Sequence, residues 1–237
     1  MLASYCLRFV STLMLFFLGM ANAATNIEDI DSQVEQERQI YLPYQGVLLS
    51  LLDDKKNHIY HIKKKLERAN LPENFYLIPL IESRYNNHAV SHAGAVGMWQ
   101  IMPLTAVRFG LQVDSKVDER LHFESSTDAA IQYLKFLFQK FKHNEFLTLA
   151  AYNAGEGRVG SALKMPLASA ERFSSIQLPA ETKQYIYRYY ALVKLLDNKH
   201  LNKHSTLQPI NNKRLTMFDS LFHRKKIISL EAIKPFI

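Results

Sequence analysis

Residues 75–81 constrain the fold most strongly, because a helix built from these seven residues would have an apolar surface on nearly every side. A helix that is apolar all round is normally buried, so we expect this segment at the centre of a hydrophobic core. A leucine-proline pair at 71–72 ends the preceding helix, and a new helix is expected to begin near Glu73. Pro79 lies far enough into that helix to kink it, and Glu82 directly follows the apolar run.

Apolar residues at helical spacing predict further helices on both sides of this segment. No alternating apolar and polar segment of useful length precedes residue 200, so we predict an all-α fold with a short irregular tail, in which residues 227–230 could add one short strand. Residues 92–97 contain four small residues and are expected to form a close-packed loop. The other helices are predicted over residues 48–66, 103–109 and 147–154, and the last two of these end at Gly110 and Gly155. Two more are predicted to begin at a side-chain cap, one at Ser126 or Thr127 and running to residue 141, the other at Thr182 and running to residue 196.

The first 23 residues have the composition of a secretory signal peptide. Arg8 is their only charged residue, an apolar run spans residues 9–20, and Ala21-Asn22-Ala23 matches an A-x-A cleavage site. The alternative is an uncleaved anchor, although the run is shorter than the ~20 apolar residues that a membrane span needs. Cleavage would remove Cys6, the only cysteine, so the mature chain would hold no disulfide and no thiol nucleophile. We therefore expect a soluble periplasmic protein.

Composition divides the rest of the chain into three parts. Residues 24–44 are predicted to be a flexible N-terminal lead-in, 45–197 one helical domain, and 198–237 a basic C-terminal extension. The formal net charge of the whole chain is +7. Positive charge suits an anionic partner such as peptidoglycan, which carries acidic peptides, whereas export argues against nucleic acid. An ordinary solvated surface would also account for this charge.

Glu82 is the first candidate for chemistry. A carboxyl group held against apolar walls is costly to ionise, so its pKa rises. A carboxylic acid that is still protonated near neutral pH can act as the general acid of glycoside cleavage. Taken alone, Glu82 could equally be a solvent-facing glutamate at a helix end or the ion-pair partner of Arg84.

Three sequence blocks decide between these readings. They are the run from Glu82 to Pro103, which contains E-S-R-Y and G-A-V-G-M-W-Q-I-M-P, the A-A-Y-N-A-G run at 150–155, and the L-P-A-E-T-K-Q-Y run at 178–185. In this order they resemble the soluble lytic transglycosylase (SLT, family 1) family, most closely the subfamily of membrane-bound lytic transglycosylase D. The resemblance covers roughly residues 45–197 and implies a lysozyme-like catalytic domain related to goose-type lysozyme.

The resemblance also implies roles for individual residues. Glu82 matches the catalytic acid, and Met102 matches an apolar wall of the subsite. Ser91 and Gln100 match residues that hydrogen-bond the sugar N-acetyl group and the glutamate. The remaining substrate-binding positions line the cleft or its rim, and they are Ala151, Tyr152, Asn153, Tyr185 and Glu181.

Some of these positions also have a purely structural interpretation. Trp99 could stack on a sugar ring or belong to the core, with equal support for each. Tyr152 and Asn153 could form a buried hydrogen bond that ties two helices together. Tyr189 shares a helical face with Tyr185 and is expected to be a core residue.

The Glu82 block contains no second acid before Asp114, whereas most glycosidases need two carboxylates. By the resemblance, Glu82 works alone. It protonates the bond between N-acetylmuramic acid and N-acetylglucosamine, the substrate's N-acetyl group stabilises the anomeric centre, and Glu82 then takes the proton from the C6 hydroxyl to close a 1,6-anhydro ring. A hydrolytic muramidase of the same fold and a non-catalytic peptidoglycan-binding scaffold are the alternatives.

Other chemistries have weaker signals. His88 and His92 are four residues apart but lie in a predicted loop, so we predict no metal site and no cofactor. No G-x-S-x-G nucleophile motif occurs, and the glycines of residues 155–162 follow a helix where a phosphate loop would follow a strand. We expect a monomer that acts on peptidoglycan glycan strands and could serve a cell-envelope assembly. The wall-binding LysM repeats usual in the resembled subfamily are not expected after residue 197.

Overall fold

The computed structural model describes residues 30–164 and 176–197. Over these residues the secondary structure is helical, which confirms the predicted all-α architecture, and β-structure is limited to isolated bridges such as Val90 with Val96. Within the same ranges no helix is long and apolar enough to cross a membrane. The predicted signal peptide and the tail with its predicted strand lie outside the described residues.

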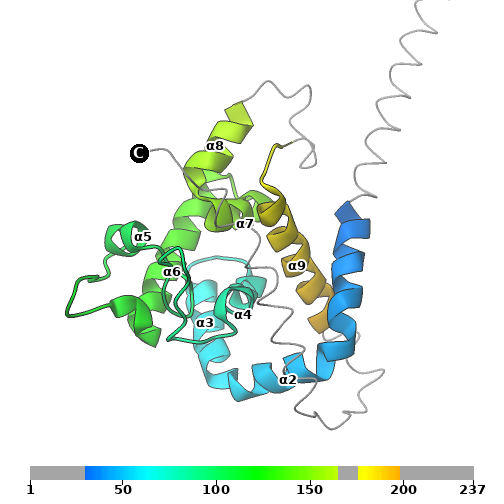
Figure 1. The fold of residues 1–237 in the computed structure, drawn as a ribbon, viewed down its shortest axis with the longest axis horizontal. Helices are drawn as coiled ribbons and strands as arrows, with labels where there is room; N and C mark the ends of the chain where they lie inside the picture. Colours follow the sequence, from blue (N-terminus) through cyan, green and yellow to red (C-terminus); the bar gives the residue numbers. More distant parts are fainter. Residues whose placement is uncertain (1–29, 165–175, 198–237) are drawn as a thin grey trace, which may run out of the picture.

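The elements follow one another around a short central helix, α4 (Figure 1). Three short 3₁₀ helices, η1, η2 and η3, join the longer ones. In chain order they are η1 Leu42–Tyr44, α2 Gln45–Asp54, α3 Lys56–Arg68, η2 Glu73–Leu77, α4 Ile78–Ser83, α5 Pro103–Arg108, η3 Glu119–Leu121, α6 Phe123–Lys140, α7 Glu145–Ala154, α8 Glu156–Lys164 and α9 Ala180–Leu196.

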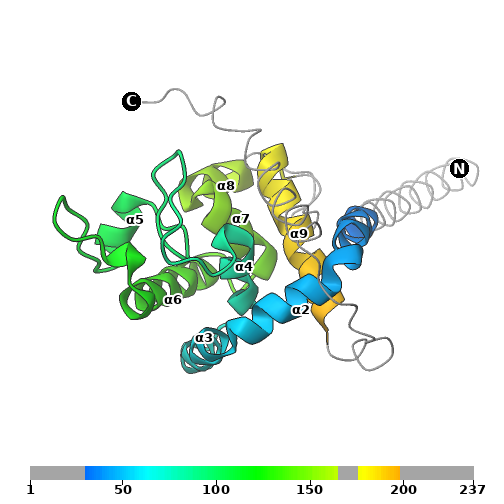
Figure 2. The same ribbon diagram turned by 60° about the horizontal axis from the view of Figure 1, so that its bottom comes forward.

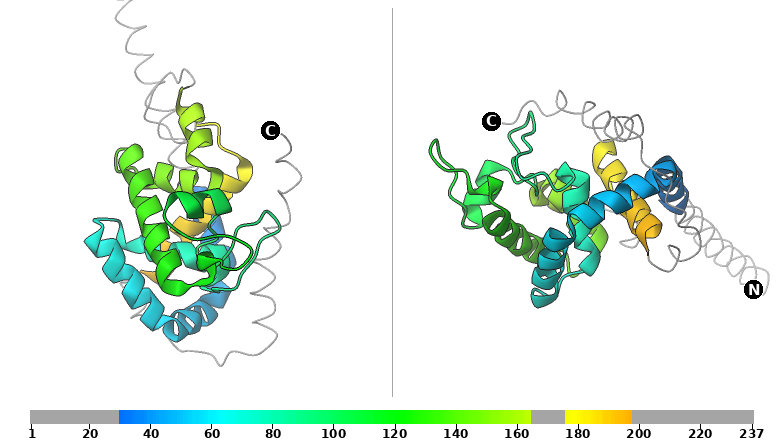
Figure 3. Two further views of the ribbon diagram at one scale, coloured as in Figure 1. Left: turned by 90° about the vertical axis from the view of Figure 1, so that its left-hand side faces the viewer. Right: turned by 90° about the horizontal axis from the view of Figure 1, so that it is seen from below.

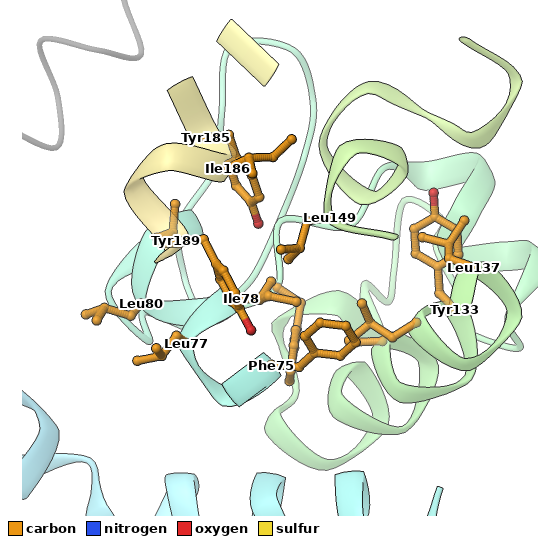
Figure 4. Packing of buried hydrophobic residues seen from close by; sticks show 14 of the residues in the cluster. Phe75, Leu77, Ile78, Leu80, Tyr133, Leu137, Leu149, Tyr185, Ile186 and Tyr189 are labelled. Carbon is orange, nitrogen blue, oxygen red and sulfur yellow. The ribbon is translucent and has the colours of Figure 1, made fainter. Parts of the chain in front are cut away.

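Helix α4 lies at the centre of the core, as its apolar sequence predicted. Ile78 and Leu80 are fully buried, and side chains from α6, α7 and α9 pack round them (Figure 4). A second view shows α4 among α3, α6, α7 and α9 (Figure 2), and it packs against η2 and α9. Burying a leucine or isoleucine side chain stabilises a fold by about 1.5–3 kcal/mol, so this segment holds the other helices together.

Several predicted helix boundaries were wrong. Residues 73–77 form a 3₁₀ helix and α4 begins afresh at Ile78, so Pro79 falls in a first turn, where no hydrogen bond is lost and no kink results. The single helix predicted over 48–66 is two helices, because the backbone leaves helical geometry at Lys55. Residues 92–97 form the predicted loop, and α5 ends just before Gly110, which adopts a φ of 89°.

None of the serine and threonine residues that were predicted to cap a helix does so. Helix α6 begins at Phe123, so Ser126 and Thr127 lie inside it and are buried. Helix α9 begins directly after Pro179, so Thr182 is likewise internal. The caps were misplaced because mostly polar residues follow the first residue of each helix, Glu-Ser-Ser after Phe123 and Glu-Thr-Lys after Ala180, and apolar periodicity does not locate such turns.

Two helical segments were missed. Residues 30–41 are helical, which corrects the predicted flexible lead-in, and Val34 and Tyr41 from this segment are buried. Its acidic composition concealed these few buried apolar residues, and the segment runs beside α9 (Figure 3). Helix α8 was also missed, because its two glycines suggested a loop, yet Val159 is fully buried and fixes the helix to the core.

Candidate active site

Glu82 lies in the last turn of α4, half-buried, where the chain turns sharply. Just beyond the helix end at Ser83, Arg84 and Tyr85 adopt the left-handed conformation, with φ of 56° and 59°. This conformation is uncommon for residues other than glycine. Two hydrogen bonds hold this turn, since the Tyr85 hydroxyl donates to the Tyr76 carbonyl at 2.8 Å and Ser83 Oγ donates to the Met98 carbonyl at 2.7 Å. The carboxyl group of Glu82 is therefore presented from a rigid backbone.

Two tyrosine hydroxyls face Glu82 from different helices. Tyr152 belongs to α7 and Tyr185 to α9. Burial first, and then the negative charge of Glu82, raises the pKa of both hydroxyls well above the ordinary value of 10.0. Both groups therefore stay neutral beside the carboxyl group over the whole physiological pH range.

The two hydroxyls differ in their hydrogen bonds. The Tyr152 hydroxyl donates to the Trp99 carbonyl at 2.7 Å, which ties α7 to the loop before α5. The Tyr185 hydroxyl is buried and lies against Glu82, but their contact falls short of hydrogen-bond geometry. A buried hydroxyl without a hydrogen bond costs about 1–3 kcal/mol, and such a group is available to a ligand that reaches it.

The loop between α4 and α5 carries Ser91 and Gln100, both half-buried. Ser91 Oγ accepts a hydrogen bond from the Ala95 amide at 2.9 Å, which closes a tight turn. Gln100 has a φ of 49°, and its side-chain amide donates to the carbonyls of Ala89 at 3.2 Å and Gly97 at 2.8 Å. Both side chains therefore shape the loop, and the Gln100 donor is occupied by backbone.

Arg120 is a site-shaping residue that the sequence reasoning missed. It is 5% exposed, and its guanidinium donates to the carbonyls of Gly94 at 2.9 Å and Ile101 at 3.1 Å. Asp118 holds the same group with two hydrogen bonds of 2.8 and 2.7 Å. Arg120 thus ties together both sides of the loop. In the sequence it stands in an ordinary charged run, and no local pattern distinguishes it from a surface arginine.

Gly97 brings this loop against the backbone of Arg120. Its φ is 82°, and a Cβ atom at this position would lie 1.9 Å from the Arg120 carbonyl oxygen. Glycine is required here both for its backbone conformation and for the close approach. Gly97 thus serves the close packing of this loop against protein backbone.

The other predicted positions lie at several points around α4. Met102 precedes α5 and is 44% exposed, while Glu181 is exposed in the first turn of α9. Ala151 and Asn153 flank Tyr152 on α7, the first buried and the second half-buried. The contacts of the structure bring Glu82, Tyr152 and Tyr185 together, whereas Ser91 and Gln100 bond to their own loop.

The structure also decides the residues that had two interpretations. Trp99 is fully buried, and its indole nitrogen donates to Thr127 Oγ1 at 3.1 Å, so it is a core residue. Tyr189 is also fully buried, as expected. His88 and His92 are exposed in the loop, and no group of three or more potential metal ligands occurs within residues 30–164 and 176–197.

Part of this chain matches a known protein family. Residues 59–172 match the family model described as the transglycosylase SLT domain. Over these residues the chain is similar to the SLT domain family. The match includes Glu82, the loop with Gln100 and the Tyr152 region, whereas α9 and its Tyr185 lie beyond it.

Several curated proteins to which this chain is similar are named murein transglycosylases. Membrane-bound lytic murein transglycosylase D of Escherichia coli (strain K12) is 35% identical over 170 residues, which make up 71% of this chain and 38% of that protein. Soluble lytic murein transglycosylase of the same strain is 29% identical over 144 residues, covering 54% of this chain and 22% of that protein. The matched part of the chain therefore spans well under half the length of each of these two relatives.

Among solved structures, this chain is similar to a 70-kDa soluble lytic transglycosylase determined in complex with bulgecin A. The two share 28% sequence identity with a TM-score of 0.49, over 62% of this chain and 25% of that chain. The 70-kDa soluble lytic transglycosylase of Escherichia coli gives 24% identity and a TM-score of 0.47, over 73% of this chain and 32% of that chain.

Proposed function

We propose that this protein is a peptidoglycan lytic transglycosylase with Glu82 as its only catalytic acid and base. One observation carries the proposal, namely that Glu82 lies in the last turn of the buried α4 helix, beside the neutral hydroxyls of Tyr152 and Tyr185, within a chain that matches the SLT family model. A carboxyl group with apolar walls and neutral neighbours is suited to hold a proton until a leaving oxygen needs it.

The proposed reaction needs a single carboxyl group. Glu82 donates its proton to the glycosidic oxygen between N-acetylmuramic acid and N-acetylglucosamine, and that bond breaks. The substrate's own N-acetyl oxygen stabilises the anomeric carbon, as in other substrate-assisted enzymes. Glu82, now a carboxylate, takes the proton of the C6 hydroxyl, whose oxygen bonds to the anomeric carbon and closes the 1,6-anhydro ring.

The surrounding residues receive supporting roles in this proposal. Tyr185, whose hydroxyl has no hydrogen bond of good geometry, donates to the reacting sugar. Ser91 and Gln100 offer their remaining acceptor capacity to the N-acetyl group from the loop that Arg120 holds. Met102, exposed before α5, supplies an apolar wall, and Glu181 lies at the rim.

We also propose that the protein acts in the periplasm as a monomer. Residues 1–23 have a basic start, an apolar run and an A-x-A site, which is the pattern of a secretory signal peptide. Peptidoglycan lies outside the cytoplasmic membrane, so the proposed substrate requires this export. The proposed catalytic domain comprises residues 45–197, with the segment 30–41 packed against it.

Clearance of purified peptidoglycan sacculi tests this function. The proposal expects the wild-type protein to solubilise sacculi and Glu82→Gln, which cannot donate a proton, to be at least about 100-fold slower. Glu73→Gln is the matched control, because Glu73 is an exposed glutamate that pairs with Lys63 away from the site, and its activity should equal wild type.

Two outcomes would contradict the proposal. Full activity in Glu82→Gln would remove Glu82 from the chemistry. A folded wild-type protein that binds sacculi without solubilising them would favour the non-catalytic scaffold instead.

A further inference from the structure

Glu37 is a buried carboxylate outside the region that matches the SLT family model. It lies on the helical segment 30–41 and is only 4% exposed. Burying a charged group costs several kcal/mol unless hydrogen bonds and opposite charge offset the loss of water. An N-terminal segment that served only as a leader would have no reason to bury such a residue, so its partners are informative.

The partners of Glu37 belong to α9. The side-chain amide of Gln184 donates a hydrogen bond to Glu37 Oε1. One turn beyond Glu37, Tyr41 is almost fully buried, and burial is the main cause that raises its pKa to about 12, while Arg188 lowers it and Glu37 raises it. Arg188 lies one turn beyond Gln184 and is itself buried. Two turns of segment 30–41 therefore meet two turns of α9 through buried polar groups.

The figures show the same arrangement. The segment 30–41, dark blue, runs beside α9 in two independent views (Figures 2 and 3). Two further contacts lie near the C-terminal end of α9, where Lys194 forms an exposed ion pair with Asp31 at 3.0 Å and Gln45 Nε2 of α2 donates to the Leu195 carbonyl at 3.0 Å. An exposed ion pair contributes only about 0–1 kcal/mol, so the buried group around Glu37 fixes the position of α9.

Helix α9 also carries Tyr185, which follows Gln184 directly in the sequence. Successive residues of a helix point about 100° apart, so α9 holds Glu37 with one residue and faces Glu82 with the next. A displacement of α9 would move both side chains together. A misplacement of about 1 Å near a reacting centre can lower a rate about 100-fold.

We infer that Glu37 is a positioning residue of the active site, which clamps Gln184 so that Tyr185 stays against Glu82. The effect of Glu37 on the reaction rate rests on the proposed function, whereas its effect on the position of Tyr185 rests on the contacts alone. The N-terminal helical segment is thus a working part of the catalytic domain.

Steady-state kinetics on soluble glycan strands provide the first test. Glu37→Ala should lower kcat about 10- to 100-fold with little change in KM, because the loop with Ser91 and Gln100 is held by Arg120 and not by α9. Glu35→Ala is the matched control, since Glu35 is 45% exposed on the same segment and bonds only to Arg38 and Gln39. It should leave kcat unchanged.

A double-mutant cycle separates positioning from general stability. If Glu37 acts through Tyr185, Glu37→Ala should cost little further activity in a Tyr185→Phe protein, so the two effects are less than additive. The exchanged pair Glu37→Gln with Gln184→Glu, which rebuilds the hydrogen bond in reverse, should recover most of the lost kcat. Fully additive effects, or no recovery by the exchange, would overturn the inference.

A spectroscopic test works without enzymatic activity. In protein labelled with ¹³C at the tyrosine ring carbon that bears oxygen, the Tyr185 signal should shift when Glu82 is replaced by Gln. The same Glu82→Gln change should no longer shift it in Glu37→Ala, but should still do so in Glu35→Ala. This measurement still tests the positioning role of Glu37 if the wild-type protein proves inactive and the proposed function fails. A Tyr185 signal that responds to Glu82→Gln in Glu37→Ala as it does in wild type would refute that role.

Discussion

Gly97→Ala should be one of the most damaging single-atom changes that this chain can carry. Two separate costs combine at this position. Gly97 has a φ of 82°, and an L-residue in this region costs about 1–2 kcal/mol. The new Cβ would also lie 1.9 Å from the carbonyl oxygen and 2.9 Å from the carbonyl carbon of Arg120. Backbone must therefore move, which typically costs a further 1–3 kcal/mol, roughly what an overpacked core loses.

The expected loss in the free energy of unfolding is thus about 2–5 kcal/mol, and two other glycines separate its parts. Gly94 has a φ of 85° but open space around its Cβ position, so Gly94→Ala should lose only the conformational part, about 1–2 kcal/mol. Gly46 lies in α2 with open space and ordinary φ, so Gly46→Ala should be neutral or stabilising by about 0.5–1 kcal/mol.

Urea unfolding followed by circular dichroism measures all three variants, and thermal unfolding provides a check at about 2–4 °C per kcal/mol for a domain of this size. The order of stability should be Gly46→Ala, then Gly94→Ala, then Gly97→Ala. If Gly97→Ala were as stable as Gly94→Ala, the close approach to Arg120 would have no energetic weight, and the account of how the loop is held would be wrong.

Three further changes test the same loop and its neighbours. Arg120→Lys keeps one charge but loses the planar fork, so it should destabilise the protein by about 1–3 kcal/mol in urea unfolding, and an unaffected value would contradict the role of the guanidinium. Hydrogen bonds from Arg120 lower the pKa of Asp118 below its ordinary value of 3.8. The pair therefore contributes full stability above pH 3.8 and loses it as the pH falls through the lower folded pKa, so Asp118→Asn should flatten the acid side of the stability profile, and an identical slope would argue against the pair. Trp99→Phe removes the hydrogen bond to Thr127 and should cost about 1–3 kcal/mol, whereas a loss of sacculus binding at unchanged stability would restore the sugar-stacking interpretation.

The sequence sufficed for the centre of the fold because the α4 segment carries its own signal. An uninterrupted apolar run ending at Glu82 can be satisfied only by burial, and the structure places it in the middle of the core. Local boundaries were less predictable. The left-handed turn at Arg84 and Tyr85 contains no glycine from which it could be predicted. Tertiary hydrogen bonds impose that conformation on ordinary residues.

Long-range contacts account for the rest of what the sequence did not reveal. Tyr185 reaches Glu82 across about a hundred residues, and nothing in the spacing of either segment specifies that meeting. Arg120 and Glu37 resemble surface charges in sequence, yet both are buried because a specific partner comes from another element. Such residues become visible only when the packing of helices brings the partners together.

Mass spectrometry of the fragments released from sacculi distinguishes a transglycosylase from a hydrolase. Wild-type protein should release muropeptides whose N-acetylmuramic acid ends in a 1,6-anhydro ring, one water lighter than the hydrolysed form, and Glu82→Gln should release none above background. Fragments that carry ordinary reducing ends would contradict the single-carboxyl transglycosylase mechanism and identify the protein as a hydrolase that uses water as its nucleophile.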